Sequence, residues 1–511
     1  MPRSTAIIPT VAPWTNKDSS STHGSKLYNM YVSKDAAGQF HAVKRPGLDY
    51  ETGFNPSLGT YAGNNLGSGI GQLVSTTGTT GSRMYQIWGR SVLMQDGASS
   101  FALKGIMNGT YTGKMFHAQL GDYIYITTLD SAPTANSLSR FDIGTALDDI
   151  DTGTYAASAG FPTKSGLLLA GGLQVLDQYL CVMTTSGRIY NSATGDGTSW
   201  SSIDFVTAEM AIDNGIFLGK HHNHLVAFSE RSIEFFYNAD LPTGSPFLRR
   251  EDAAIDTGGV GTNAFAQFED MIFFVAQGPY GDRYVAMLKN FQVVRISDTD
   301  VERRFWFGDS TVQATILHGV CLKIAGKLFY VLTGTDNSDG STEITMVYDV
   351  EVNQWYHWAL NGDAAIKLMG ATNGGSQYSQ GNILYIQNKD YVYAIDPQFT
   401  RDETTSGATH TITCKITLPE WTGEPHEMGR SKFVRQLKLL CDESTDLSDT
   451  VQIEVSSDNF ATWTSLGSIP RNMLSKITQL GKYYRLAIRL THAYNSTFRA
   501  QALHLEYDSG I

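Results

Sequence analysis

The stretch GLQVLDQYLCVMTTSGRIY, residues 172–190, shows the pattern that decides the fold. Two runs rich in β-branched, aromatic and other apolar residues, Gly172–Val182 and Gly187–Tyr190, flank a short polar turn. A run, a turn and a second run predict an antiparallel pair of strands. Because comparable pairs recur about every 45 to 50 residues from Ile70 to Phe399, the sequence predicts a repeat architecture.

Six further pairs follow the same pattern. They lie at Leu73–Ser75 with Met84–Trp88, Met115–Leu120 with Tyr123–Thr127, Ile216–Gly219 with His224–Phe228, Ala264–Phe268 with Met271–Val275, Val320–Ile324 with Lys327–Leu332, and Ile366–Met369 with Ile383–Gln387. Each unit is too small to bury its own faces, and radial stacking of such units makes a β-propeller. Either six or seven blades fit these units, because a terminal unit can be shared.

The segment before the repeats is predicted to close the ring. Residues 1–25 read as an irregular arm, and Lys26–Val32 with Gln39–Lys44 reads as a hairpin that Arg45-Pro46-Gly47 ends. Propellers commonly close when one chain end completes a blade made by the other. We therefore expect the hairpin at residues 26–45 to take that role.

After the polar residues 402–409 the pattern changes to longer alternating strands, which predict a β-sandwich. They lie at Thr411–Leu418, Ser431–Leu440, Thr450–Ser456, Tyr483–Leu490 and Ala502–Tyr507. The expected organisation is all-β: an N-terminal arm and closing hairpin over residues 1–60, a propeller over 61–400 and a sandwich over 401–511. The one helical turn expected lies at Asp298–Arg304.

Charge and hydropathy exclude several classes of function. The net charge is −12, and the 38 Lys and Arg residues are scattered, so tight binding to nucleic-acid phosphates is not expected. No stretch reaches the roughly 20 apolar residues that span a bilayer, and we expect no signal peptide. The four cysteines, Cys181, Cys321, Cys414 and Cys441, lack metal-ligand spacing and are expected to be buried free thiols.

Two motifs resemble metal sites, and both have simpler interpretations. His221-His222-Asn223-His224 is expected at a hairpin tip, where neighbouring side chains point to opposite faces, so an exposed polar turn is favoured over a metal site. Asp336-Asn337-Ser338-Asp339-Gly340 fails the calcium-loop register, because alignment on Gly340 places Met346 at the twelfth position. We expect no metal and no cofactor.

Two further motifs indicate turns. Ser456 to Trp463 resembles the Asp-box hairpin of sialidases, with Phe460 where that box has glycine. Tyr348 to Trp355 resembles the end of a kelch-type blade, in which the Trp packs between blades. Because no nucleophile, base and orienting group are assembled anywhere in the sequence, the chain is not expected to be an enzyme.

Four stretches, taken in order, resemble a viral family. They are Leu27–Val32 with Lys44–Leu48; Gly187–Ser192 with Gly195–Trp200 and Ile203–Glu209; Arg231–Phe236 with Gly244–Phe247 and Ile255–Gly258; and Val294–Ser297 with Val301-Glu302. Together they are similar to the tail hub or nozzle proteins of short-tailed bacteriophages, also called packaged-DNA stabilisation proteins. The resemblance covers residues 27 to 305.

This resemblance implies a structural virion protein of the tail, assembled in the host bacterial cytoplasm. It implies a homo-oligomeric ring, a hexamer, below the portal and its adaptor, which extends the DNA channel, retains packaged DNA and bears fibres or tailspikes. DNA would pass without sequence-specific binding. A local hypothesis is that Glu234 or Glu302 pairs with Arg249 or Arg295 between blades.

Two other function classes predict different sequence features. A glycan-binding or carbohydrate-active propeller predicts repeated Asp boxes, and this sequence has one altered box. A cellular scaffold propeller predicts WD or kelch signatures in every blade, which this sequence lacks.

Overall fold

The structure is a computed structural model. It describes residues 3–11, 26–35, 37–55, 68–75, 81–107, 113–127, 129, 138–144, 146–149, 160–305, 317–335, 343–374, 376–378, 383–388, 391–405, 407–423, 427, 429–472 and 475–510.

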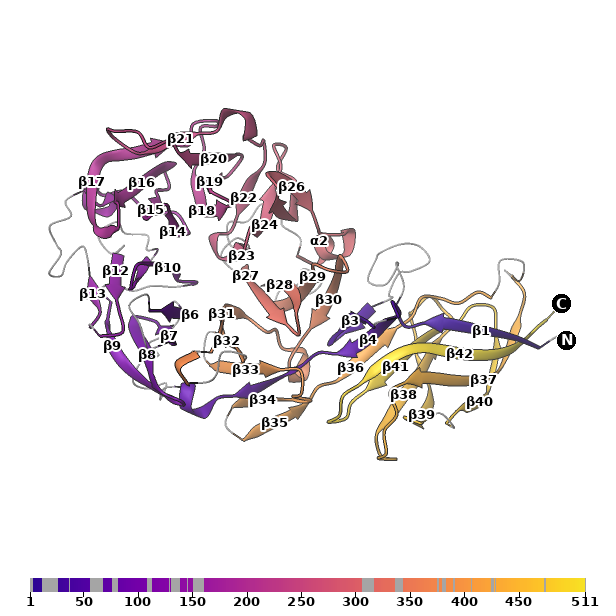
Figure 1. The fold of residues 1–511 in the computed structure, drawn as a ribbon. Coiled ribbons are helices and arrows are strands. Elements are labelled where there is room, and N and C mark those ends of the chain that lie inside the picture. Colours follow the sequence, from indigo (N-terminus) through magenta and orange to yellow (C-terminus); the bar gives the residue numbers. More distant parts are fainter. Residues whose placement is uncertain are drawn as a thin grey trace.

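Within these residues, seven antiparallel blades are arranged around one axis, and the strands of each blade run in order from the axis to the rim (Figure 1). Blade 1 holds β6 (Ser68–Val74), β7 (Ser82–Trp88), β8 (Ser91–Gly97) and β9 (Ser100–Ile106); blade 2 holds β10 (Phe116–Leu120), β11 (Tyr123–Thr127), β12 (Leu138–Phe141) and β13 (Asp148–Asp149). Blade 3 holds β14 (Gln174–Leu176), β15 (Tyr179–Met183), β16 (Arg188–Ala193) and β17 (Asp196–Thr207); blade 4 holds β18 (Gly215–His221), β19 (His224–Ser229), β20 (Ile233–Asn238) and β21 (Phe247–Arg249).

Blades 5 to 7 complete the ring. Blade 5 holds β22 (Gly258–Val260) and β23 (Ala266–Phe268), both paired with β24 (Met271–Gln277), then β25 (Arg283–Lys289) and β26 (Gln292–Arg295). Blade 6 holds β27 (His318–Ile324), β28 (Lys327–Thr335), β29 (Glu343–Asp349) and β30 (Gln354–Trp358), and blade 7 holds β31 (Leu368–Asn373), β32 (Leu384–Asn388), β33 (Val392–Asp396) and β5 (Gly47–Tyr50). The predicted propeller is confirmed, and the number of blades is resolved as seven.

The strand that closes the ring differs from the one expected. Blade 7 is completed by β5, which pairs antiparallel with β33 from Tyr50↔Tyr393 to Asp396↔Gly47. The hairpin at residues 26–45 does not close the propeller, because its strands pair with the C-terminal sheets instead. Chain closure therefore uses the segment that directly follows the predicted hairpin. Gly47 is required there, since a Cβ atom would lie 1.9 Å from the carbonyl oxygen of Arg401.

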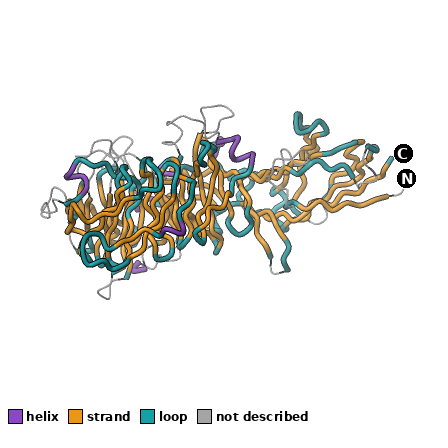
Figure 2. The backbone as a smooth tube through the Cα atoms, turned by 90° about the horizontal axis from the view of Figure 1, so that it is seen from above, coloured by secondary structure: helices purple, strands orange, loops and turns teal. Residues whose placement is uncertain are grey.

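The C-terminal part is the predicted sandwich of two sheets (Figure 2), with strands from both ends of the chain. One sheet holds β1 (Arg3–Pro9), β3 (Met30–Lys34), β4 (Phe40–Lys44), β42 (Arg499–Ser509), β37 (Lys432–Cys441) and β40 (Ile477–Tyr483). The other holds β2 (Lys26–Tyr28), β36 (Cys414–Thr417), β41 (Ala487–His492), β38 (Thr450–Ser456) and β39 (Thr464–Pro470). The hairpin of β34 (Arg401–Thr405) and β35 (Ala408–Thr411) connects β33 to this region.

The N-terminal arm contains a strand that the sequence pattern did not predict. Residues 3–9 pair with β42, with Ile8 buried and Ile7 exposed, as expected for one face packed on a core. Pro9 is the last residue of this edge strand, where proline is tolerated.

A shared core joins the propeller to the sandwich. One cluster of buried side chains includes Val331 and Trp358 of blade 6, Ile386 of blade 7, and Leu437 and Leu490 of the sandwich. In addition, β30 of blade 6 pairs with β2 of the sandwich, so a single nine-stranded sheet runs from β27 to β39. The two parts therefore form one packed unit.

The predicted helical turn is α2 (Thr299–Phe305), and the kelch-like stretch forms the turn between β29 and β30. The Nε1 atom of Trp355 donates to the carbonyl oxygen of Ile296 in blade 5 at 2.7 Å, which confirms the expected packing between blades. Within the part of the chain that the structure describes, no helix is long and apolar enough to cross a bilayer.

A substitution in β5 tests how much the closing strand contributes. Leu48 is 4% exposed in the shared core, so Leu48→Ala should lower the free energy of unfolding by about 2–5 kcal/mol. Chemical denaturation followed by tryptophan fluorescence measures this. The matched control is Leu447→Ala, at a residue 71% exposed, which should change stability by less than about 0.5 kcal/mol. Equal effects of the two substitutions would contradict a closing role for β5.

Candidate functional site: the propeller axis and the junction

One lysine bridges the centre of the propeller. The ammonium of Lys114, just before β10, donates to the carbonyl oxygens of Phe265 in blade 5 (2.9 Å) and Gly319 in blade 6 (3.1 Å). Its backbone N–H donates to Oδ1 of Asn263, also in blade 5, at 3.2 Å. Blades 5 and 6 lie opposite blade 2 in a ring of seven, so these bonds cross the axis (Figure 1). The disc is therefore closed to a nucleic-acid strand at this level.

Aromatic rings reinforce the closure beside Lys114. Phe116 of β10 meets Phe217 of β18 with ring centroids 5.8 Å apart, and Phe217 stacks on Phe265 at 4.4 Å. Gly171 of blade 3 lies against these rings, and a Cβ atom there would approach Thr262 to 2.1 Å. The rings of Phe116 (blade 2), Phe217 (blade 4) and Phe265 (blade 5) thus pack together next to Gly171 of blade 3.

Side-chain amides and a second lysine tie neighbouring inner strands together. Gln174 of β14 donates through Nε2 to the carbonyl oxygen of Leu218 in blade 4 at 3.2 Å, and Lys220 donates back to the carbonyl oxygen of Val175 at 3.1 Å. The backbone N–H of Lys220 also donates to Oε1 of Gln267 in blade 5. These bonds fix the angle between blades 3, 4 and 5.

The junction between propeller and sandwich contains a buried ion pair. The guanidinium of Arg45 binds both carboxylate oxygens of Asp402, at 2.9 and 2.6 Å, and the two side chains are 1% and 2% exposed. Arg45 also donates to Oδ1 of Asn29 (3.0 Å) and to the carbonyl oxygen of Ala359 (2.8 Å). Asp402 in turn accepts from the backbone N–H of Leu48 in β5. The pair therefore contacts the hairpin, the closing strand and the end of blade 6 together.

Asn29 is the second residue of this junction. It has a φ of 54°, a left-handed conformation that Asn adopts more readily than most residues. Its backbone N–H donates to the carbonyl oxygen of His357, its Oδ1 accepts from the N–H of Ala359, and its Nδ2 donates to the carbonyl oxygen of Thr413. One amide side chain thus satisfies backbone groups of both parts. The resemblance stretches 27–32 and 44–48 meet at this point.

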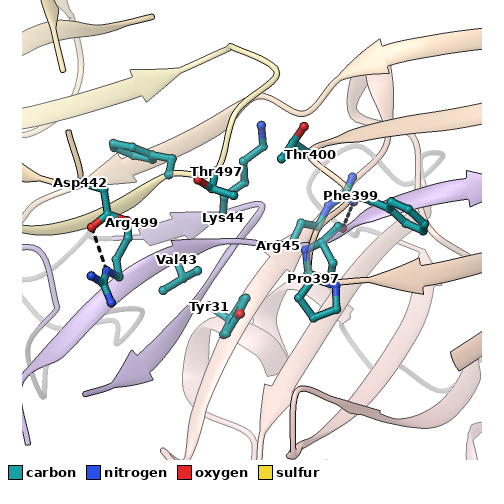
Figure 3. A pocket seen from close by; sticks show the side chains of 12 residues that line it. Tyr31, Val43, Lys44, Arg45, Pro397, Phe399, Thr400, Asp442, Thr497 and Arg499 are labelled. Atoms are coloured by element: carbon teal, nitrogen blue, oxygen red, sulfur yellow. Dashed lines mark hydrogen bonds and ion pairs between the residues drawn. The ribbon is translucent and has the colours of Figure 1, made fainter. Parts of the chain in front are cut away.

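A groove with a volume of about 160 Å³ runs along the same junction (Figure 3). Its charged groups are already paired. The ammonium of Lys44 donates to the carbonyl oxygens of Tyr494 (2.7 Å) and Ser496 (3.2 Å), and burial lowers the pKa of Lys44. Arg499 binds Asp442 at 3.0 Å. The groove is therefore part of the contact between propeller and sandwich, and these charged groups bind protein partners.

Both Glu234 and Glu302 bind one of the two expected arginines, although not between blades. Arg249 on β21 binds the buried Glu234 on the neighbouring strand β20 at 3.2 Å, and Glu234 also accepts from the backbone N–H of Met210. Arg295 at the end of β26 binds Glu302 on α2. The expectation that these pairs join different blades is wrong, because each partner lies on the next element along the chain.

The histidine motif ties blade 4 to blade 5. The backbone N–H of Phe291 donates a hydrogen bond to Nε2 of His221, so Nε2 carries no proton. The ring proton of His221 is therefore on Nδ1, which donates to the carbonyl oxygen of Asp270 at 2.6 Å. His222 binds the carboxylate of Asp270 at 3.1 Å. The motif lies at a hairpin tip as expected, but His221 is fully buried rather than exposed. Among the described residues, no three His, Cys, Asp or Glu side chains are grouped to hold a metal.

The altered Asp box is a structural turn between β38 and β39. Asp458 accepts from the side chain of Ser456 (2.7 Å) and from the hydroxyl and backbone N–H of Thr462, and these bonds, led by the Thr462 hydroxyl, lower the pKa of Asp458 to about 2. Phe460 takes the glycine position with a φ of 66°.

The calcium-like stretch 336–340 lies outside the described residues. All four cysteines are free thiols, with Cys181 and Cys414 buried and the other two partly buried.

These observations define a seven-bladed β-propeller rigidly joined to a β-sandwich. Residues 172–307 match the family model described as "Bacteriophage P22 Gp10, beta-propeller". The matched part contains blades 3 to 5 and α2, and three of the four resemblance stretches fall within it. The chain is thus similar to a bacteriophage structural family over this part, which supports a virion structural protein.

Solved structures resemble the chain at low identity. BamB from Moraxella catarrhalis is 13% identical, with a TM-score of 0.35, covering 71% of this chain and 92% of its own. The N-terminal domain of Nup159 is 11% identical, with a TM-score of 0.36, covering 73% and 98%. An exo-β-1,3-galactanase from Phanerochaete chrysosporium is 9% identical, with a TM-score of 0.30, covering 85% and 100%. No curated protein matches the chain.

Removing the charge of Arg45 from its buried pair with Asp402 should destabilise the protein. Arg45→Met leaves Asp402 buried without its partner, which should lower the free energy of unfolding by about 3–5 kcal/mol. Urea denaturation measures the difference. Asp442→Asn is the control, since its pair with Arg499 is 38% and 49% exposed and should contribute about 0–1 kcal/mol. If Arg45→Met costs no more than Asp442→Asn, the junction does not depend on this pair.

Two buried histidines should make the protein less stable in acid. Burial lowers the pKa of His318 to about 3 and of His492 to about 4, whereas an unfolded histidine titrates near 6.5. Between about pH 6.5 and 4 the unfolded chain binds more protons, so stability falls by about 1.4 kcal/mol per pH unit for each such histidine. In denaturation at a series of pH values, the His318→Asn variant should lose stability less steeply by about that amount below about pH 6.5, and match the parent's slope above it. An unchanged slope would contradict the assignment.

Proposed function

We propose that this chain is a structural subunit of the tail hub or nozzle of a short-tailed bacteriophage, without a catalytic role. In this proposal it forms a ring below the portal and adaptor, extends the DNA channel, helps retain packaged DNA and carries fibres or tailspikes. The observation that carries the proposal is the family match over residues 172–307, which coincides with the resemblance stretches of blades 3 to 5.

The closed axis bears on where DNA would pass. Lys114 bonds to carbonyl oxygens on the opposite side of the disc, so a single propeller does not offer a passage along its axis. A channel for DNA is then enclosed between several copies of the chain. A closed ring of copies uses two different patches on each subunit, joined head to tail. The proposal therefore assigns the propeller to the body of each subunit.

The charge of the chain suits a wall that DNA passes without binding. The net charge of −12 repels phosphates, and such repulsion opposes adhesion to the channel wall. The rigid junction supports the same role. A continuous core and a nine-stranded sheet prevent the propeller and the sandwich from moving independently, as a part that withstands force requires.

The test is assembly with the neighbouring tail components. The purified full chain, mixed with its portal and adaptor proteins, should add a ring of density with an open central channel in negative-stain images, with six-fold symmetry. Portal and adaptor without this chain provide the control. A monomer that adds no density, and that binds oligosaccharides on a glycan array, would overturn the proposal in favour of a glycan-binding propeller.

A further inference from the structure

The inner strands of the propeller lack negative charge in an otherwise acidic protein. The chain contains 50 Asp and Glu residues, yet none lies in the described inner strands, which are β6, β10, β14, β18, β22, β23, β27 and β31. These strands do contain Lys220 and Lys323, and Lys114 directly precedes β10. The described inner strands therefore carry a net positive charge, and a low-dielectric surrounding strengthens the field of such charges.

Lys114 has no counter-charge among the residues that the structure describes. Two of its three ammonium protons are donated to carbonyl oxygens, and among the described residues no carboxylate lies within ion-pair distance of it. Burial lowers the pKa of Lys114 to about 8, so at neutral pH the ammonium is still mostly protonated. An unpaired cation in such a place is unfavourable unless something supplies negative charge.

In the described part of the chain, the titratable groups that interact with Lys114 are not anions either. Lys114 is close enough to His117 and His318 to contribute to lowering their pKa values to about 4 and 3, after burial itself. Burial raises the pKa of the Cys321 thiol to about 12, so that it stays protonated. The Nδ1 atom of His318, a side chain only 6% exposed, has no hydrogen-bond partner within the described part of the chain. Gly319, whose carbonyl binds Lys114, is the next residue.

Three residues at the centre are only partly covered. Lys114, His117 and Cys321 each keep part of their surface exposed, although they lie on or beside inner strands. Part of the Lys114 residue is therefore exposed to solvent, while the bonds across the axis exclude anything as wide as a polymer.

We propose that the propeller axis binds a small free oxyanion, of the size of phosphate, against the ammonium of Lys114. The anion would supply the missing counter-charge. One of its oxygens would accept a charge-assisted hydrogen bond from the third N–H of the ammonium. Bound there, it would also stabilise the contact of blade 2 with blades 5 and 6, since it binds the folded chain alone. This inference does not depend on the proposed virion function.

The experiment compares sodium phosphate with sodium chloride at equal ionic strength and pH 7, using the full chain. Thermal unfolding and calorimetric titration should show stabilisation and saturable binding with phosphate only. The Lys114→Met variant should bind phosphate at least tenfold more weakly, whereas Lys323→Met, which removes an exposed inner-strand lysine, should bind like the parent. Equal phosphate effects in the parent and in Lys114→Met would indicate an adventitious ion only.

Because Lys114 also ties blades together, its loss can lower stability by itself. The measured quantity is therefore the phosphate-dependent shift within each variant, and Lys114→Arg, which keeps the charge, should retain most of it. If Lys114→Met does not fold, lysine-selective NMR of the parent protein tests whether phosphate binds at Lys114. Phosphate should move the Lys114 resonance, assigned through Lys114→Arg, and leave that of Lys323 in place. No movement would overturn the proposal.

Discussion

The buried pair of Arg45 and Asp402 is the interaction on which the arrangement of the molecule depends. It lies where the sandwich hairpin ends, the closing strand begins and blade 6 meets both. A buried ion pair contributes little net stability compared with apolar packing, but it is highly selective about geometry. Its hydrogen bonds to Asn29 and Ala359 allow one relative orientation of propeller and sandwich. The apolar core supplies the driving force, and the pair specifies the position.

Alternation in the sequence was sufficient to predict the propeller and the sandwich, because both depend on short-range periodicity. The strand pair at 172–190 and its relatives lie at nearly the residues expected. The pairing of strands that are far apart in the sequence could not be predicted in this way. The pairing of β5 with β33, and of β1 with β42, depends on which edges remain free after folding, and no local pattern encodes that.

The candidate site shows the same limit. The pairs of Glu234 with Arg249 and of Glu302 with Arg295 could be predicted, because a charged residue beside apolar runs needs a partner. Lys114 and Asn29 gave no comparable signal. Lys114 follows a segment without periodicity, and its partners are backbone carbonyls, which every residue has. Asn29 acts through a left-handed backbone conformation and an amide that bonds to main chain, features that only the assembled structure reveals.

The pairing of the first strand with the last also constrains how the chain folds. Arg3 lies opposite Asp508, and β5 pairs with β33, between Tyr50↔Tyr393 and Gly47↔Asp396, so its partner comes much later in the sequence. During synthesis β1 therefore has no partner among the described strands until nearly the whole chain has emerged, and such long-range pairing is slow to form. Blades 1 to 6 hold strands from one continuous stretch each and can form earlier. The bonds of Lys44 to Tyr494 and Ser496 form last, so the contact between propeller and sandwich is complete only when almost the whole chain has been made.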